Sequence, residues 1–177
     1  FADGNVKSER GNVGNARIHG IETLFDFDLN EIIFKNNDID LNYFINYSFI
    51  KSEYLESDEV GVEGNSVEFV PAHNLKTGLK FGFKNLSFNF QYSFISKQFT
   101  DSSNAKDGNL SGVIGEIPGY SLGDISASYK LKNISFEAGI NNLFDEKYFT
   151  RRATGYPGPG IIPSAPRNLY FTLQMKF

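Results

Sequence analysis

Cysteine and tryptophan are missing from this 177-residue sequence, which also has one methionine and two histidines. Without cysteine, the chain has no disulfide framework, no thiolate metal site and no cysteine nucleophile. Charged residues make up 21% of the sequence and the formal net charge is −4. The chain therefore lacks the basic surplus that sequence-independent binding to nucleic acid needs.

Long apolar runs are missing as well. No segment approaches the roughly 20 consecutive apolar residues of a membrane-spanning helix, which excludes a helical membrane protein but not a β-barrel. Aromatic residues, in contrast, are abundant, with 18 phenylalanines and nine tyrosines. Aromatic side chains favour strands over helices.

Apolar and polar residues alternate along most of the chain. The pattern is clearest near the C-terminus, where every second residue from Leu169 to Phe177 is apolar and the residues between them are polar. A period of two predicts strands that have one apolar and one polar face. Seven segments show this pattern: 16–29, 39–49, 73–83, 86–94, 120–131, 134–141 and 167–177.

The connections between these segments alternate in length. Lys84-Asn85 and Lys132-Asn133 each fit a two-residue hairpin turn, with asparagine as the residue that tolerates a positive φ. Residues 30–38 form a somewhat longer turn on the same side. Long loops are expected on the other side, at about 50–72, about 99–119 and about 145–166. Short turns at one end and long loops at the other are typical of an outer-membrane barrel.

The two faces of the predicted strands also fit a membrane barrel. The polar face is mostly serine, asparagine, glutamine, threonine and glycine, which suits a water-filled lumen. The strands are about ten residues long, as a tilted crossing requires. Aromatic residues such as Tyr47, Phe49, Tyr129 and Phe177 lie near the ends of the apolar faces, where interfacial girdles occur. A soluble antiparallel barrel or sandwich shows the same alternation and stays an alternative.

The predicted fold is therefore all-β, an antiparallel transmembrane β-barrel segment of about seven strands. Bacterial single-chain barrels have an even number of strands, so seven do not close one. We expect residues 1–177 to be the C-terminal portion of a longer barrel protein.

Motifs at three places occur in a characteristic order. They are Asn15-Ala16-Arg17-Ile18-His19-Gly20-Ile21-Glu22, then Ile140-Asn141-Asn142-Leu143-Phe144-Asp145-Glu146-Lys147-Tyr148, then Pro166-Arg167 ahead of the last strand. Together they resemble the C-terminal part of TonB-dependent outer-membrane receptors. The run 151–161 is similar to the last extracellular loop of receptors in the ferric-citrate group.

This resemblance implies a barrel of about 22 strands with a plugged lumen, in the bacterial outer membrane. Such receptors bind a scarce solute outside the cell, often a ferric chelate, and TonB acting on the plug drives its uptake. The plug, the TonB-contacting segment and most strands are absent from these 177 residues. The implied partners are a ferric chelate, TonB through the absent plug, and outer-membrane lipid and lipopolysaccharide. No nucleic acid and no cofactor is expected.

The last loop contains the candidate substrate-binding residues Arg151, Arg152 and Tyr156. A ferric-citrate-like chelate presents carboxylates, which arginine pairs bidentately. A solvated loop or a lipopolysaccharide contact is an equally good interpretation of the two arginines. The alternation of proline and glycine over 157–160 fits a stiff loop above the pore, but a tight turn back to the last strand is favoured.

Several other residues are interpreted structurally. Leu143 and Phe144 close the penultimate strand, and Asp145 is expected to cap the turn that follows. His19 and His73 lie on different strands without a second metal ligand. Six acidic residues follow Phe49, and a solvated face is favoured for them over divalent-cation binding: Glu53, Glu56, Asp58, Glu59, Glu63 and Glu68.

No catalytic arrangement is recognisable, and no enzyme is predicted. Asp26 and Asp28 share one face, which a wet lumen accommodates without chemistry. The leading hypothesis is a fragment of a transport receptor. Two alternatives stay open: a small standalone barrel or surface-binding protein, and a soluble β-barrel that carries an apolar ligand.

Overall fold

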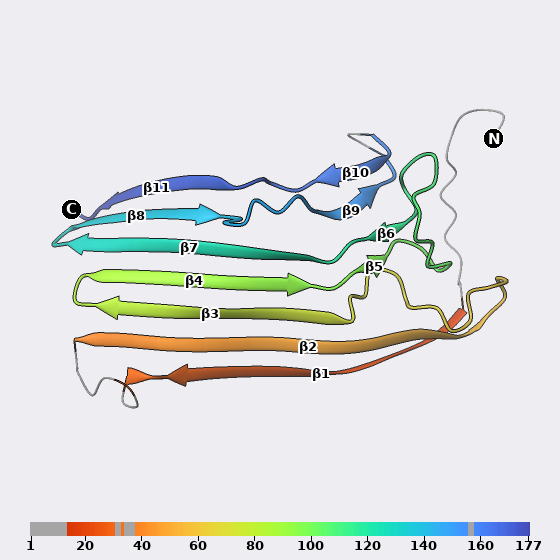
Figure 1. Ribbon diagram of the computed structural model, residues 1–177, viewed down its shortest axis with the longest axis horizontal. Coiled ribbons are helices and arrows are strands. Elements are labelled where there is room, and N and C mark those ends of the chain that lie inside the picture. The colour runs from red at the N-terminus through yellow and green to blue at the C-terminus, as the bar shows by residue number, and fades with distance from the viewer. Residues whose placement is uncertain (1–13, 31–32, 34–37, 156–157) are drawn as a thin grey trace.

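A curved antiparallel sheet dominates the structure, a computed structural model that describes residues 14–30, 33, 38–155 and 158–177. Its seven strands lie in the order β1-β2-β3-β4-β7-β8-β11, and neighbouring strands are antiparallel (Figure 1). The strands are β1 Gly14–Asp28, β2 Ile39–Ser57, β3 His73–Phe83, β4 Leu86–Ile95, β7 Tyr120–Leu131, β8 Ile134–Asn141 and β11 Asn168–Met175. These are the seven strands that the alternation predicts.

The strand β2 is longer than predicted. It continues to Ser57, whereas the sequence pattern places a loop from about residue 50. Residues 50–57 pair with residues 14–20 of β1, and a bulge at Asn15/Ala16 adjusts the register. This half of β2 has no clean apolar face, so the period of two fades although the backbone remains paired.

The two later loops contain short strand pairs that the sequence pattern does not reveal. Gln98–Phe99 (β5) pairs with Glu116–Ile117 (β6), and Phe149–Ala153 (β9) pairs with Gly160–Pro163 (β10). Segments of two to five residues are too short to show a period. Both pairs lie at the same end of the sheet, opposite the short turns (Figure 1).

The short turns have the predicted length but not the predicted residue in the left-handed conformation. The positive φ falls on Lys84 (53°) and Lys132 (50°), the first residue of each turn, rather than on Asn85 and Asn133. A non-glycine residue is uncommon there, and the tight connection between paired strands imposes it.

One face of the sheet is apolar and has no layer packed on it. Leu169 is 78% exposed and Phe171 is 68% exposed, although both lie on regular β11. Among the described residues, the buried hydrophobic side chains are Tyr54, Val62 and Ile117, all at the loop end. An uncovered apolar face of this extent argues against the soluble-carrier alternative, because soluble monomers rarely expose one.

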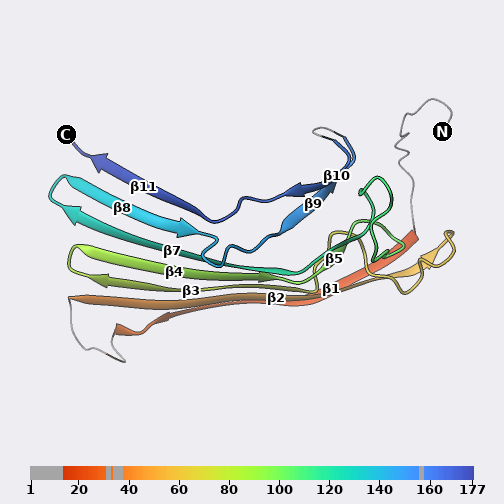
Figure 2. The ribbon, with the colours of Figure 1, turned by 45° about the horizontal axis from the view of Figure 1, so that its top comes forward.

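The sheet curves without closing. Figure 2 shows β8 and β11 turned up relative to β2 and β3, as in a section of a barrel wall. The strands β1 and β11 are its two edges. Within the described residues, no helix is long and apolar enough to cross a membrane.

Aromatic rings cover glycines across strands on the polar face. Phe44 lies opposite Gly78 and Tyr170 lies opposite Gly139 in the register. A Cβ atom at Gly78 would come within 2.6 Å of the Phe44 ring and 2.7 Å of the Phe90 carbonyl oxygen. One at Gly139 would lie 2.5 Å from the Tyr170 ring. Each glycine therefore provides the space in which a neighbouring ring packs.

Replacing Gly78 by alanine should destabilise the barrel by about 1–3 kcal/mol, because a fixed carbonyl as well as a ring occupies the space of the new methyl group. The free energy of unfolding in urea, measured on the protein in detergent, tests this. Gly155→Ala is the matched control, since nothing lies within 4 Å of a Cβ there. Equal stability of the two variants would contradict the packing argument.

Candidate functional site

The loops at one end of the sheet form a connected layer. The first loop (58–72) joins β2 to β3, the second loop (96–119) carries β5 and β6, and the third loop (142–167) carries β9 and β10. Figure 1 shows all of them beyond the same strand ends. These loops are the part of the chain that a solute on this side would meet.

Asparagine side chains hold the first loop to the second. The Asn104 Oδ1 atom accepts from the Ser66 N–H at 2.8 Å, and its Nδ2 atom donates to the Ser66 carbonyl at 2.8 Å. The Asn65 Nδ2 atom donates to the Ser102 carbonyl at 2.8 Å. Side-chain amides thus supplement the backbone hydrogen bond from the Phe69 N–H to the Phe99 carbonyl, at 2.9 Å, which joins the same two loops.

Arg152 holds the second loop to the third. Its Nη1 atom donates to the Gly112 carbonyl at 2.9 Å and its Nη2 atom to the Glu116 carbonyl at 3.0 Å. The guanidinium carbon also lies 5.2 Å from the centre of the Phe149 ring. The half-buried Arg152 side chain therefore has structural partners within the loop layer.

The other predicted site residues are placed differently. Arg151 precedes Arg152 on β9 and its side chain is exposed. The exposure along β9 does not alternate: Thr150 and Arg151 are exposed, and Arg152 is half-buried because it reaches the second loop. Tyr156 lies outside the described residues. Of the predicted set, Arg151 is the described residue whose side chain stands open to solvent.

The segment after β8 is a hydrogen-bonded junction built on Asn142, which is only 5% exposed. Its Oδ1 atom accepts from the Glu146 N–H at 2.9 Å, and its Nδ2 atom donates to the Glu146 carbonyl at 2.9 Å and the Ala165 carbonyl at 3.4 Å. The Asn142 N–H donates to the Asp124 carboxylate at 2.9 Å. Asn142 thereby joins the end of β8, the strand β7 and the approach to β11.

The strand β8 ends at Asn141, so Leu143 and Phe144 lie in the turn after it instead of closing the strand as expected. Asp145 caps a different element from the predicted one. The Leu143 N–H donates to the Gly123 carbonyl at 2.7 Å, and the Phe144 ring lies on Gly123. The Asp145 carboxylate accepts from the N–H of Arg167 at 3.2 Å, 22 residues away, just before β11. The motif therefore combines a local hydrogen-bonded pair, Asn142 and Glu146, with hydrogen bonds to residues that are distant in sequence.

Several of the acidic residues after Phe49 have individual partners. Glu53 forms ion pairs with Arg17 and Lys51, and hydrogen bonds from Lys51 and then Arg17 lower the pKa of its carboxyl group. Glu56 accepts from the Asn15 amide at 3.0 Å, and Glu68 accepts from the Tyr54 hydroxyl at 2.6 Å. In the described part of the chain, no group of three or more potential ligands is arranged to hold a metal ion.

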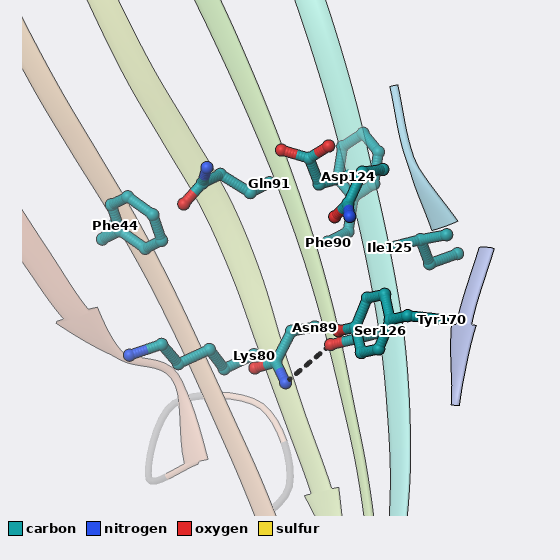
Figure 3. Close-up of a pocket in the computed structure, with 10 residues that line it drawn as sticks. Phe44, Lys80, Asn89, Phe90, Gln91, Asp124, Ile125, Ser126 and Tyr170 are labelled. Carbon is teal, nitrogen blue, oxygen red and sulfur yellow. Dashed lines mark hydrogen bonds between the residues drawn. The ribbon is translucent and has the colours of Figure 1, made fainter. Parts of the chain in front are cut away.

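A shallow pocket of about 270 Å³ lies on the polar face of the sheet, near mid-height. Figure 3 shows Lys80, Asn89, Gln91 and Asp124 on adjacent strands around it, with the rings of Phe44 and Tyr170 at its sides. The Tyr170 hydroxyl donates to Glu137 at 3.0 Å. A wet, mixed-charge wall of this kind suits a lumen, as the predicted polar face implies. The alternation of apolar and polar residues predicts no role for Phe44, because a single aromatic residue on a polar face does not follow the period of two.

Asn142→Ala should lower the free energy of unfolding by about 2–4 kcal/mol, because the buried N–H and carbonyl groups around it lose their partners together. Asn141→Ala is the matched control: Asn141 is exposed and its side chain makes one hydrogen bond, to Asn168 at 2.9 Å. Urea denaturation of both full-length variants checks the difference. A loss as large in the control would refute the role of the junction.

Burial, and then the hydrogen bond to Glu68, raise the pKa of Tyr54 to about 12. An unfolded tyrosine ionises near pH 10, so the folded protein holds this proton more tightly. The resulting stabilisation is complete below about pH 10 and is lost as the pH rises to about 12. The ultraviolet titration curve of the protein, after subtraction of the curve of its Tyr54→Phe variant, should show a phenolate that forms near pH 12. A difference titration centred near pH 10 would contradict this.

Comparisons with known proteins agree with this architecture. A family model described as TonB dependent receptor-like, beta-barrel matches residues 2–143. The metal-pseudopaline receptor CntO of Pseudomonas aeruginosa is 25% identical over 165 residues, which are 93% of this chain and 21% of that protein. The chain thus spans about a fifth of this relative.

Solved structures show the same likeness. The unliganded ferric citrate transporter FecA superposes with a TM-score of 0.79 and 28% identity, over 92% of this chain and 24% of FecA. The ferric yersiniabactin receptor FyuA from Yersinia pestis gives 0.73 at 19% identity, over 94% of this chain and 24% of FyuA, and supports the fold alone. The expected similarity to the ferric-citrate group is confirmed by FecA.

The family is one of transport receptors rather than enzymes, and its barrels are proteins of the bacterial outer membrane. Its model matches most of the chain, and the strand order, the two-faced sheet and the one-sided loops are those of such a barrel wall. The chain therefore belongs to the TonB-dependent receptor β-barrel family.

Proposed function

We propose that residues 1–177 are the C-terminal portion of a larger outer-membrane receptor that takes up a ferric siderophore or a ferric-citrate-like chelate. The observation that carries this proposal is the likeness to FecA, which extends over 92% of the chain at 28% identity. The two sheet edges, β1 and β11, would pair with strands contributed by the rest of the barrel. Energy would reach the receptor from TonB through a plug, which these residues do not include.

The alternatives fit the structure less well. A standalone barrel would have to close, but the seven-stranded sheet keeps its edges β1 and β11 apart. A soluble carrier would need a covered apolar face, and Leu169 and Phe171 are largely exposed. No catalytic step is proposed for any residue of the chain.

Arg151 supports the choice of an anionic chelate. Its exposed guanidinium stands on β9 in the loop layer, where it can pair with a solute carboxylate. Its neighbour Arg152 is committed to two backbone carbonyls and would act by holding β9 in place. The acidic residues Glu53 and Glu68 at the same end have partners of their own, which reduces their repulsion of an anion.

Arg151→Ala in the full-length receptor should weaken ferric-citrate binding by about tenfold, because one charge-assisted pair contributes about 1.5–3 kcal/mol. Arg151→Lys should recover part of the affinity, since it keeps the charge without the planar fork. Thr150→Ala, exposed on the same strand, is the matched control. Isothermal titration calorimetry measures the three.

Arg152→Ala must be assessed separately, because its loss loosens the loop layer. We expect it to lower the free energy of unfolding as well as the affinity, whereas Arg151→Ala should change the affinity alone. Unchanged ferric-citrate binding in Arg151→Ala would remove this residue from the proposed site.

A further inference from the structure

The pattern Asn-X-Ser occurs at four places in the sequence. In this pattern the asparagine side chain is the acceptor for N-linked glycans, provided that X is not proline. The four places are Asn46-Tyr47-Ser48, Asn85-Leu86-Ser87, Asn109-Leu110-Ser111 and Asn133-Ile134-Ser135. A pattern of three residues is common, so the structural surroundings of each asparagine decide whether a modifying enzyme can reach it.

Three of these asparagines lie within or between paired strands. Asn46 is in β2, opposite Leu24 of β1 and Lys76 of β3. Asn85 and Asn133 belong to two-residue turns, and the serine of each pattern is already part of the next strand. A glycosyltransferase must bend its acceptor segment into its own active site. These three segments would have to break hydrogen bonds of the sheet in order to bend.

Asn109 lies instead at the exposed tip of the second loop. Residues 106–111 are all exposed and belong to no strand, and Leu110, the middle residue of the pattern, is fully exposed. Figure 1 shows the green segment between β5 and β6 projecting beyond the ends of the long strands. A surface loop of this kind is the part of a folded chain that another enzyme reaches most easily.

The hydrogen bonds of the Asn109 side chain within the described residues engage its oxygen rather than its nitrogen. The Oδ1 atom accepts from the Ser111 hydroxyl at 3.1 Å, from the Val113 N–H at 3.0 Å and from the Ile114 N–H at 3.2 Å. The Gly112 N–H donates to the Asn109 carbonyl at 2.8 Å and closes the turn. The amide nitrogen, which is the atom that accepts a glycan, is therefore carried on a fixed and exposed turn.

We propose that Asn109 is an N-glycosylation site. The donor is an oligosaccharide linked to a polyprenyl diphosphate. The Nδ2 atom forms a bond to the anomeric carbon of the first sugar, while the bond from that carbon to the phosphate oxygen breaks. The polyprenyl diphosphate leaves with the electron pair, and the amide proton passes to a base of the transferase. The proposal rests on the proposed function in one respect: the loop end, and with it the glycan, lies outside the cell.

The test uses the full-length receptor purified from the outer membranes of its own bacterium. Trypsin cleaves after Lys106 and Lys130, which isolates residues 107–130, and Asn109 is the only asparagine in that peptide. Mass spectrometry should find the peptide heavier by whole sugar residues, and fragmentation should place them on Asn109. The variant Asn109→Gln, expressed in the same bacterium, should give the peptide without sugar.

Two Ser111 variants test whether the pattern itself is recognised. Ser111→Ala should abolish the glycan although Asn109 is still present, and Ser111→Thr should keep it, because threonine also satisfies the pattern. Asn85→Gln is the matched control and should leave the glycan in place. An unmodified peptide from the native receptor, or a glycan that persists in Ser111→Ala, would overturn the proposal. Ferric-citrate binding is measured separately by calorimetry, so that either proposal can fail without the other.

Discussion

The pairing of backbone groups in a sheet that borders lipid is the constraint on which the rest of this structure depends. An N–H or carbonyl group without a partner costs several kcal/mol where no water can reach it. Long regular strands meet this requirement, and the register then places every second residue toward the lipid. The polar face, the short turns and the two edges all follow from this pairing. Since β1 and β11 are edges, the sheet meets the requirement fully only as part of a larger barrel.

At the loop end the same requirement is met by the short pairs β5–β6 and β9–β10 together with side chains. Asn104 supplies both a donor and an acceptor to the backbone of Ser66. Asn142 does the same for the backbone of Glu146, and Arg152 donates to two carbonyls of the second loop. Planar amides and guanidinium groups with several donors are suited to irregular backbone, because each can reach groups that no regular ladder would align. The result is a loop layer whose parts depend on one another.

The alternation of apolar and polar residues predicts the seven long strands, since one face of each is apolar along most of its length. It does not predict the end of β2 at Ser57, because residues 50–57 owe their conformation to the pairing with β1. The structural role of Arg152 could not be predicted from the sequence either, because its partners Gly112 and Glu116 lie 40 and 36 residues away. Arg151 and Arg152 are equivalent in the sequence, and only the contacts of Arg152 with the folded second loop distinguish them. The motif around Asn142 was recognisable as a pattern, while its hydrogen bonds to Asp124 and Ala165 depend on the sheet.

The cross-linked loops constrain how this end of the molecule can evolve. A residue inserted in the second loop would shift Asn104 against Ser66 and Gly112 against Arg152 at once, so that a change of length in one loop disturbs its two neighbours. Replacement of an exposed side chain such as Arg151 leaves these contacts in place. New solute preferences in this region would therefore arise through point substitutions on a fixed loop frame, and changes of loop length would require compensating changes in two segments together.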